Sequence, residues 1–224
     1  MIPSLFLLLA ASVAPGASVT TWTATSANVS GAPDSIRIEI LRWSTDAERD
    51  KLMDAWMLTT TPKTATPAGR GGGGRAAGRG AGRAGRGRAE SETAPPDVAK
   101  PTPEATLATA LQAAPTVGYL WSREVAGYAI RYAGKVANPD GSERVVIITS
   151  RRLGAVNDLW KPGSGDPLPY DFSVIELHLN SRGAGEGKAS LSGKVAPDAA
   201  FKMLALENYD GLPVVFSKVQ RKAE

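Results

Sequence analysis

The sequence predicts a mainly β protein of the α+β class. We expect an antiparallel β-sandwich or a rolled barrel of about eight or nine strands, with a helical pair inserted after the second strand. Three observations predict this fold. Apolar and polar residues alternate in several segments, such as 36–40, 128–132 and 175–179, which is the period of a half-buried strand. The strand-like runs are joined by short turns of Gly, Asn, Asp and Pro, which favours antiparallel pairing. Helical spacing occurs in two segments, and both lie between the second and third strand-like runs.

Two strands are expected before the first helix. Residues 20–29 are rich in threonine, include Trp22 and carry no charge, which suits a strand. A turn is predicted at 32–34, where the sequence reads Ala-Pro-Asp. From Ile36 to Ile40 isoleucines alternate with charged residues, so one face of this second strand should be buried.

The first helix is expected over residues 46–57. Thr45 and Glu48 stand three residues apart, which is the spacing of a capping box at a helix start. Leu52 and Trp56 lie one turn apart, so their shared face should pack on the sheet.

The second helix is expected to begin at Pro103 and to end before Pro115. Thr102 is placed to cap its N terminus, and proline is favoured at the first helical position. Leu107 and Leu111 lie one turn apart on what should be the buried face.

The rest of the chain has the pattern of strands. They are expected at 117–121, 128–132, 144–149, 172–180, 188–195, 201–207 and 214–219. Tyr128, Ile130 and Tyr132 alternate and should share one face of their strand. Turns are predicted at 138–141 and in the glycine-rich stretch 183–187.

An insert separates the two helices. Residues 59–101 are rich in Thr, Pro, Gly, Arg and Ala and lack the apolar residues needed to offset the entropy of ordering, so we expect disorder. The insert divides the chain into a leader (1–17), the first part of the β domain with its helix (18–58), the insert itself (59–101), and a helix with the remaining strands (102–224). Its six arginines are Arg70, Arg75, Arg79, Arg83, Arg86 and Arg88. These arginines account for the formal net charge of +4, because the remaining 20 basic residues face 22 acidic ones.

The N terminus has the pattern of a signal peptide. The stretch from Ile2 to Ala14 is mostly apolar, and small residues follow from Gly16 to Ser18. Such a run is too short to span a membrane. We therefore expect a leader over residues 1–17, export to the periplasm or the extracellular space, and no transmembrane span after cleavage.

The composition excludes several kinds of site. The chain has no cysteine, which rules out disulfides, thiolate metal sites and cysteine nucleophiles. With a single histidine, a typical multi-histidine metal site cannot form. We expect no metal, no cofactor and no catalytic residue.

Several segments together resemble a group of short exported bacterial proteins with no assigned function. The segments that carry the resemblance are Ile38 to Asp50, Val117 to Tyr119, Tyr128 to Tyr132, Ile175 to Leu177 with the hairpin after it, and Leu206 to Tyr209. The resemblance implies export and a compact single domain, with the arginine-glycine segment as an addition. It carries no catalytic or binding residues.

Four residues are the candidates for ligand binding. His178 should share a strand face with Glu176, two residues away, and such a pair can support acid-base chemistry or bind a polar ligand. Trp160 and Lys161 lie in a loop rich in Gly and Pro, where an aromatic ring can line a ligand site.

These observations favour a non-enzymatic exported β domain that binds a partner in the cell envelope. The partner would be an envelope protein, a glycan or a small apolar ligand, whereas nucleic acid is disfavoured because the arginine segment has no aromatic residues to stack on bases. One alternative is a carboxylate-dependent hydrolase acting on glycans, with Glu176, Glu186, Asp171 and Glu207 as candidate acids. The other alternative is attachment to polyanions through the six arginines.

Overall fold

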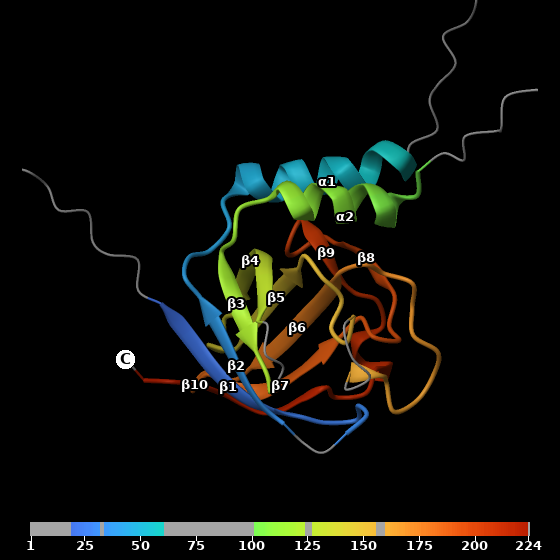
Figure 1. The fold of residues 1–224 in the computed structure, drawn as a ribbon. Helices are drawn as coiled ribbons and strands as arrows, with labels where there is room; N and C mark the ends of the chain where they lie inside the picture. Colours follow the sequence, from blue (N-terminus) through green and yellow to red (C-terminus); the bar gives the residue numbers. More distant parts are fainter. Residues whose placement is uncertain (1–18, 32–33, 61–100, 124–126, 156–159, 224) are drawn as a thin grey trace, which may run out of the picture.

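The computed structural model describes residues 19–31, 34–60, 101–123, 127–155 and 160–223 (Figure 1). The expected leader, residues 1–17, lies outside the described residues. So do residues 61–100 of the expected insert, including its six arginines. Within the described part of the chain, no helix is long and apolar enough to cross a membrane.

Eight strands form a closed antiparallel barrel, which confirms the mainly β prediction and decides between barrel and sandwich. Their order around the barrel is β1-β10-β7-β6-β5-β4-β3-β2. The strands are β1 (Thr20–Ser26), β2 (Ser35–Ile40), β3 (Gly118–Trp121), β4 (Tyr128–Ala137), β5 (Glu143–Thr149), β6 (Ser173–Leu179), β7 (Ala184–Ala189) and β10 (Phe216–Arg221). Closure leaves none of these eight strands with an unpaired edge.

Apolar side chains fill the inside of the barrel. The isoleucines of β2 point inward, as their alternation predicts, and Ile36 and Ile38 are fully buried. Trp22 of β1 and Phe216 of β10 add large rings to the same cluster. Trp43, just after β2, packs edge-on against Trp22 with ring centroids 6.2 Å apart.

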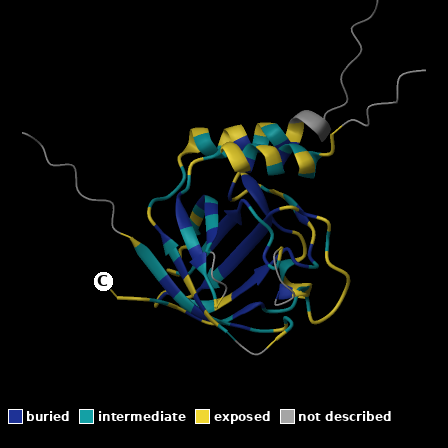
Figure 2. Cartoon of the chain, viewed as in Figure 1, coloured by how far each residue is buried: buried dark blue, intermediate teal, exposed yellow. Residues whose placement is uncertain are grey.

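Part of the outer face of β4, β5 and β6 is buried as well. Simple alternation would leave this face in water, yet Val146, Ile148 and Val174 have no exposed surface. They form a second cluster with both helices and with a hairpin made of β8 (Val195–Asp198) and β9 (Met203–Leu206) (Figures 1 and 2). The barrel wall therefore lies between two apolar layers.

The helical pair follows β2, as predicted, and consists of α1 (Asp46–Thr60) and α2 (Pro103–Ala113), which pack side by side (Figure 1). The capping box is present: Thr45 N donates to Glu48 Oε2 at 2.9 Å, and Glu48 N donates to Thr45 Oγ1 at 3.3 Å. Thr102 caps α2 by accepting a hydrogen bond from Ala105 N.

Two local predictions were wrong. The glycine-rich residues 184–187 form most of β7 rather than a turn, and the expected strand 188–195 is divided between the end of β7 and the start of β8. Glycine is needed in β7 because a Cβ at Gly185 would lie 1.9 Å from His178 O. Tyr132 does not share a face with Tyr128, because a bulge in β4 between Ile130 and Tyr132 turns it to the outer face.

Candidate functional site

Three charged or polar residues lie abreast across neighbouring strands on the outer face of the barrel. In the pairing of β5 with β6, Arg144 lies opposite His178. In the pairing of β6 with β7, His178 lies opposite Glu186. Because cross-strand partners on one face are only about 5 Å apart, this register brings the three side chains together.

A buried carboxylate supports this row from the neighbouring position of β6. Glu176 has no exposed surface, and its Oε1 accepts hydrogen bonds from Arg144 Nε at 3.1 Å and Nη2 at 2.7 Å. Its Oε2 accepts from the backbone N of Leu206 in β9 at 3.2 Å. Arg144 Nη2 also lies 3.2 Å from Asp198 Oδ2 in β8. Glu176 and Arg144 therefore fasten the β8–β9 hairpin to the barrel wall.

The pKa of Glu176 reflects two opposed effects. Burial alone would raise the pKa of this carboxyl, since it disfavours the charged form. Hydrogen bonds from His178 and Arg144, together with the Arg144 charge, outweigh burial, so the pKa lies below its ordinary value. Glu176 is therefore ionised at neutral pH and unsuited to act as a general acid.

His178 is held on both sides. Its Nε2 lies 2.8 Å from Glu176 Oε1. Its ring stacks on the ring of Tyr209, with centroids 3.7 Å apart and planes 9° from parallel. Its side chain is 37% exposed. The imidazole is thus fixed in orientation while one part of it faces solvent.

The Tyr209 ring is positioned by a buried lysine. Lys188 lies opposite Glu176 in β7, and its Nζ donates to Tyr209 O at 2.9 Å and to Asp210 O at 3.3 Å. The same ammonium lies 4.4 Å from the centroid of the Tyr209 ring. Lys188 therefore secures the segment that backs His178.

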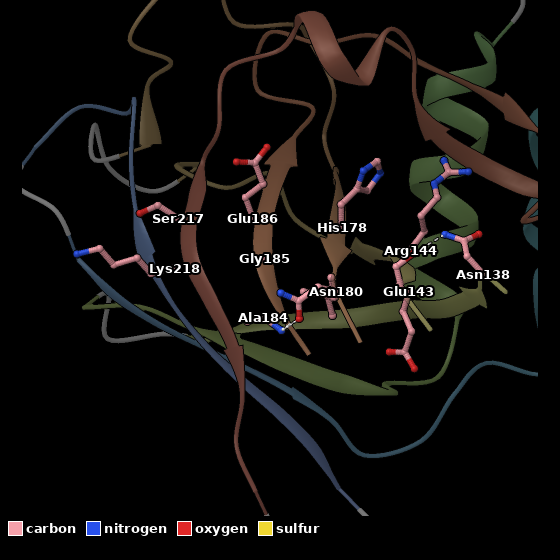
Figure 3. Close-up of a pocket in the computed structure, with 12 residues that line it drawn as sticks. Asn138, Glu143, Arg144, His178, Asn180, Ala184, Gly185, Glu186, Ser217 and Lys218 are labelled. Carbon is pink, nitrogen blue, oxygen red and sulfur yellow. Dashed lines mark hydrogen bonds between the residues drawn. The ribbon is translucent and has the colours of Figure 1, made fainter. Parts of the chain in front are cut away.

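An open depression lies beside His178, and we call it the β5–β7 depression (Figure 3). Its volume is about 670 Å³, within the range of small-molecule sites. It is lined by Asn138, Ser142, Glu143, Arg144, His178, Leu179, Asn180, Ala184, Gly185, Glu186, Ser217 and Lys218. The bare backbone of Gly185 contributes to the hollow between the polar side chains.

Two charged groups at the depression are available to a ligand. Among the described residues, neither Glu186 nor Lys218 has an ion pair or a side-chain hydrogen bond, and Glu186 is exposed. Glu143, by contrast, is ion-paired with Arg221. The depression thus presents an unpaired carboxylate and an unpaired ammonium beside an imidazole that is held in place.

Trp160 and Lys161 lie away from this depression. Trp160 is only 4% exposed and belongs to the barrel cluster, with its ring 5.9 Å from that of Phe216. Lys161 is exposed, and its backbone N donates to Ser30 Oγ at 3.1 Å. The hollow that both residues line has a volume of about 50 Å³, far below that of a typical ligand site. The four candidates therefore separate into two places.

Sequence patterns identified only part of this arrangement. His178 and Glu176 share a face, as predicted, but Arg144, Glu186 and Lys218 were not singled out as partners of His178. The pairing register of β5, β6 and β7 brings Arg144 and Glu186 beside His178, and a positive φ of 53° places Lys218 in a bulged segment of β10.

No group of three or more His, Asp or Glu side chains among the described residues is arranged to hold a metal ion. No family model matches the chain, and neither a curated protein nor a solved structure matches it significantly.

Proposed function

We propose that the protein is an exported, non-enzymatic binding domain of the periplasm or the extracellular space, and that it binds a glycan in the β5–β7 depression. The observation that carries the proposal is the row of Arg144, His178 and Glu186 beside an open hollow of about 670 Å³. Sugar hydroxyls both donate and accept hydrogen bonds, so a glycan site needs donors and acceptors close together. The row supplies both.

The rigidity of His178 supports the same proposal. A side chain that is already ordered loses little conformational entropy when a ligand binds, so it contributes more to affinity. His178 is held by Glu176 and stacked on Tyr209 before any ligand arrives. A polar ligand can therefore bind against it without a rearrangement of the wall.

The other partners fit less well. A small apolar ligand would need space inside the barrel, where Trp22, Phe216 and the isoleucines of β2 are packed. A hydrolase would need two carboxylates at the site. Glu176 is committed to Arg144, and Glu143 is ion-paired with Arg221, which leaves Glu186 as the available acid of the depression. A segment of an envelope protein remains the alternative that the binding experiment separates.

A glycan array probed with the mature chain tests the proposal. The best retained oligosaccharide is then titrated against the unaltered protein and against Glu186→Gln. Loss of a hydrogen bond to a charged group should weaken binding about tenfold. The matched control is Glu207→Gln, which removes an exposed carboxylate that does not line the depression.

The expected result is weaker binding by Glu186→Gln and unchanged binding by Glu207→Gln. The glycan proposal would be contradicted if the protein bound no glycan on the array, or if Glu186→Gln and Glu207→Gln bound the oligosaccharide equally well. Binding of an envelope protein that is lost in Glu186→Gln, without any glycan, would assign the depression to a protein partner instead.

Export has a separate test. The apolar run from Ile2 to Ala14, followed by small residues, supports cleavage near Gly16 or Ala17. Mass spectrometry of the native N terminus after cell fractionation should find that cleaved start in the envelope or the medium. An intact Met1 in the cytosol would contradict export and would return the arginine segment to consideration as a nucleic-acid binder.

A further inference from the structure

A second hollow lies on another part of the surface, where the first turn of α1 faces the bulged part of β4 and the turn between β8 and β9. We call it the α1–β4 pocket, and its volume is about 490 Å³. It shares no lining residue with the β5–β7 depression. A ligand bound in this pocket would therefore occupy a different site from the proposed glycan.

The hydroxyl of a largely buried tyrosine lies at this pocket. The bulge in β4 turns Tyr132 to the outer face, where the residue is only 4% exposed. Its hydroxyl lies against Gly134, because a Cβ at Gly134 would be 2.4 Å from that oxygen. Among the described residues the hydroxyl has no hydrogen-bond partner, and because Tyr132 lines the pocket this donor is available to a ligand.

The same hydroxyl remains a donor at neutral pH. Burial raises the pKa of Tyr132 to about 12, although the nearby Arg49 guanidinium acts in the opposite direction. A protonated phenol can donate to a carboxylate oxygen and form a charge-assisted hydrogen bond. The glycine at position 134 keeps the space beside this donor open.

The charge at the pocket favours an anion. Arg49 is ion-paired with Asp46 at 2.7 Å and with Asp50 at 2.8 Å. Lys135 and Lys202 also line the pocket, are exposed, and have no acidic partner among the described residues. Two ammonium groups without an acidic partner among the described residues therefore line the same pocket as Tyr132.

Aromatic rings complete the wall. Phe201 is buried at the pocket, and Trp43 is half-buried with Lys135 Nζ 5.0 Å from its ring centroid. An inorganic oxyanion such as phosphate or sulfate has no apolar surface that could pack against these rings. A ligand with a carboxylate on a ring that has an apolar face would contact the rings, the lysines and the hydroxyl at once.

We propose that the α1–β4 pocket binds a small ring-bearing carboxylate, with Tyr132 Oη as hydrogen-bond donor and with Lys135 and Lys202 as the charge partners. The ring is that of an acidic sugar or of an aromatic acid. Both sources share the same chemistry, a carboxylate next to an apolar ring face.

Titration of the full-length protein, observed by NMR of the ¹⁵N-labelled chain, tests the proposal. The probes are galacturonate with galactose as its neutral counterpart, and benzoate with benzyl alcohol. We expect saturable shifts at residues 132–136 and 200–202 at concentrations of about 1 mM for at least one carboxylate, and weaker binding at higher salt. Preference for galacturonate identifies an acidic sugar, and preference for benzoate identifies an aromatic acid.

Two variants and one control make the test specific. Tyr132→Phe keeps the ring, and because its hydroxyl has no partner the urea midpoint should not fall, while carboxylate binding should weaken about tenfold. Lys202→Asn removes one charge and suits the positive φ of 51° at this position. Lys194→Asn removes an exposed lysine that does not line the pocket and should bind as the unaltered protein does. Equal binding of carboxylates and neutral analogues, or unchanged binding by Tyr132→Phe and Lys202→Asn, would overturn the proposal.

Discussion

Replacement of Glu176 by Gln should destabilise the protein strongly, although the two side chains have almost the same shape. Glu176 is fully buried and accepts hydrogen bonds from Arg144, from the Leu206 backbone N and, through its contact with Nε2, from His178. A glutamine has one acceptor oxygen, so its amide group would face some of these donors. It would also leave the Arg144 guanidinium without its main counter-charge.

The expected cost is about 2–4 kcal/mol in the free energy of unfolding. Breaking a buried ion pair by removing one partner costs about 3–5 kcal/mol. The cost expected here is lower than this general range because the Arg144 side chain is 27% exposed and keeps Asp198 at 3.2 Å. Urea unfolding at pH 7, followed by tryptophan fluorescence and circular dichroism, measures the change.

The contribution of Glu176 to the free energy of unfolding should also depend on pH, in a direction set by its pKa. The pKa of Glu176 in the folded protein lies below its ordinary value of 4.5. The carboxylate therefore stabilises the fold above about pH 4.5, and this contribution is lost as the pH falls through the folded pKa. The difference between Glu176→Gln and the unaltered protein should shrink as the pH is lowered below 4.5.

A double variant distinguishes the cost of leaving one buried charge unpaired from the net contribution of the ion pair to stability. Arg144→Met combined with Glu176→Leu removes both charges and keeps apolar volume, so it should cost less than Glu176→Gln alone. An unchanged urea midpoint and m-value in Glu176→Gln would refute the reasoning, because a buried, four-fold hydrogen-bonded carboxylate cannot be lost without cost.

Three further perturbations test other parts of the fold. Glu48→Gln should lower stability by about 1 kcal/mol at pH 7, since the capping box remains but the charge opposite Arg42 is lost. Because the folded pKa of Glu48 is about 2, against an ordinary 4.5, urea titrations should show this difference vanishing between pH 4.5 and 2. Gly185→Ala should cost about 3 kcal/mol or more in thermal unfolding, because its Cβ would lie 1.9 Å from His178 O. Tyr209→Phe should be neutral or slightly stabilising in urea, because the Tyr209 hydroxyl is buried without a hydrogen-bond partner, and a clear loss of stability would contradict that placement.

Local sequence signals were sufficient for most of the elements. The alternation of isoleucines in β2 and the capping box at Thr45 depend on neighbouring residues, and both features are present in the structure. The choice between sandwich and barrel depends on the pairing of β1 with β10, which joins the two ends of the described chain. Such a long-range pairing leaves no mark in a local pattern.

Long-range contacts also explain why the sequence predicted only part of the candidate site. Because side chains alternate between the two faces of a strand, the sequence predicted that His178 and Glu176 share one face. The burial of Glu176, however, depends on the β8–β9 hairpin, which folds back over that face. Trp160 lies in a segment rich in Gly and Pro, a composition typical of surface loops, yet its ring turns into the barrel cluster. The register shift that moves Tyr132 outward has no single-residue signature either.

The most direct test of the proposed glycan site is to map where a glycan binds. The ¹⁵N-labelled protein is titrated with the best oligosaccharide from the array, and amide shifts are assigned along the chain. Binding in the β5–β7 depression should confine the shifts to residues 142–144, 178–180, 184–186 and 217–218, around the hollow of Figure 3. Shifts confined to α1 and α2, or to strands on the opposite side of the barrel, would contradict it.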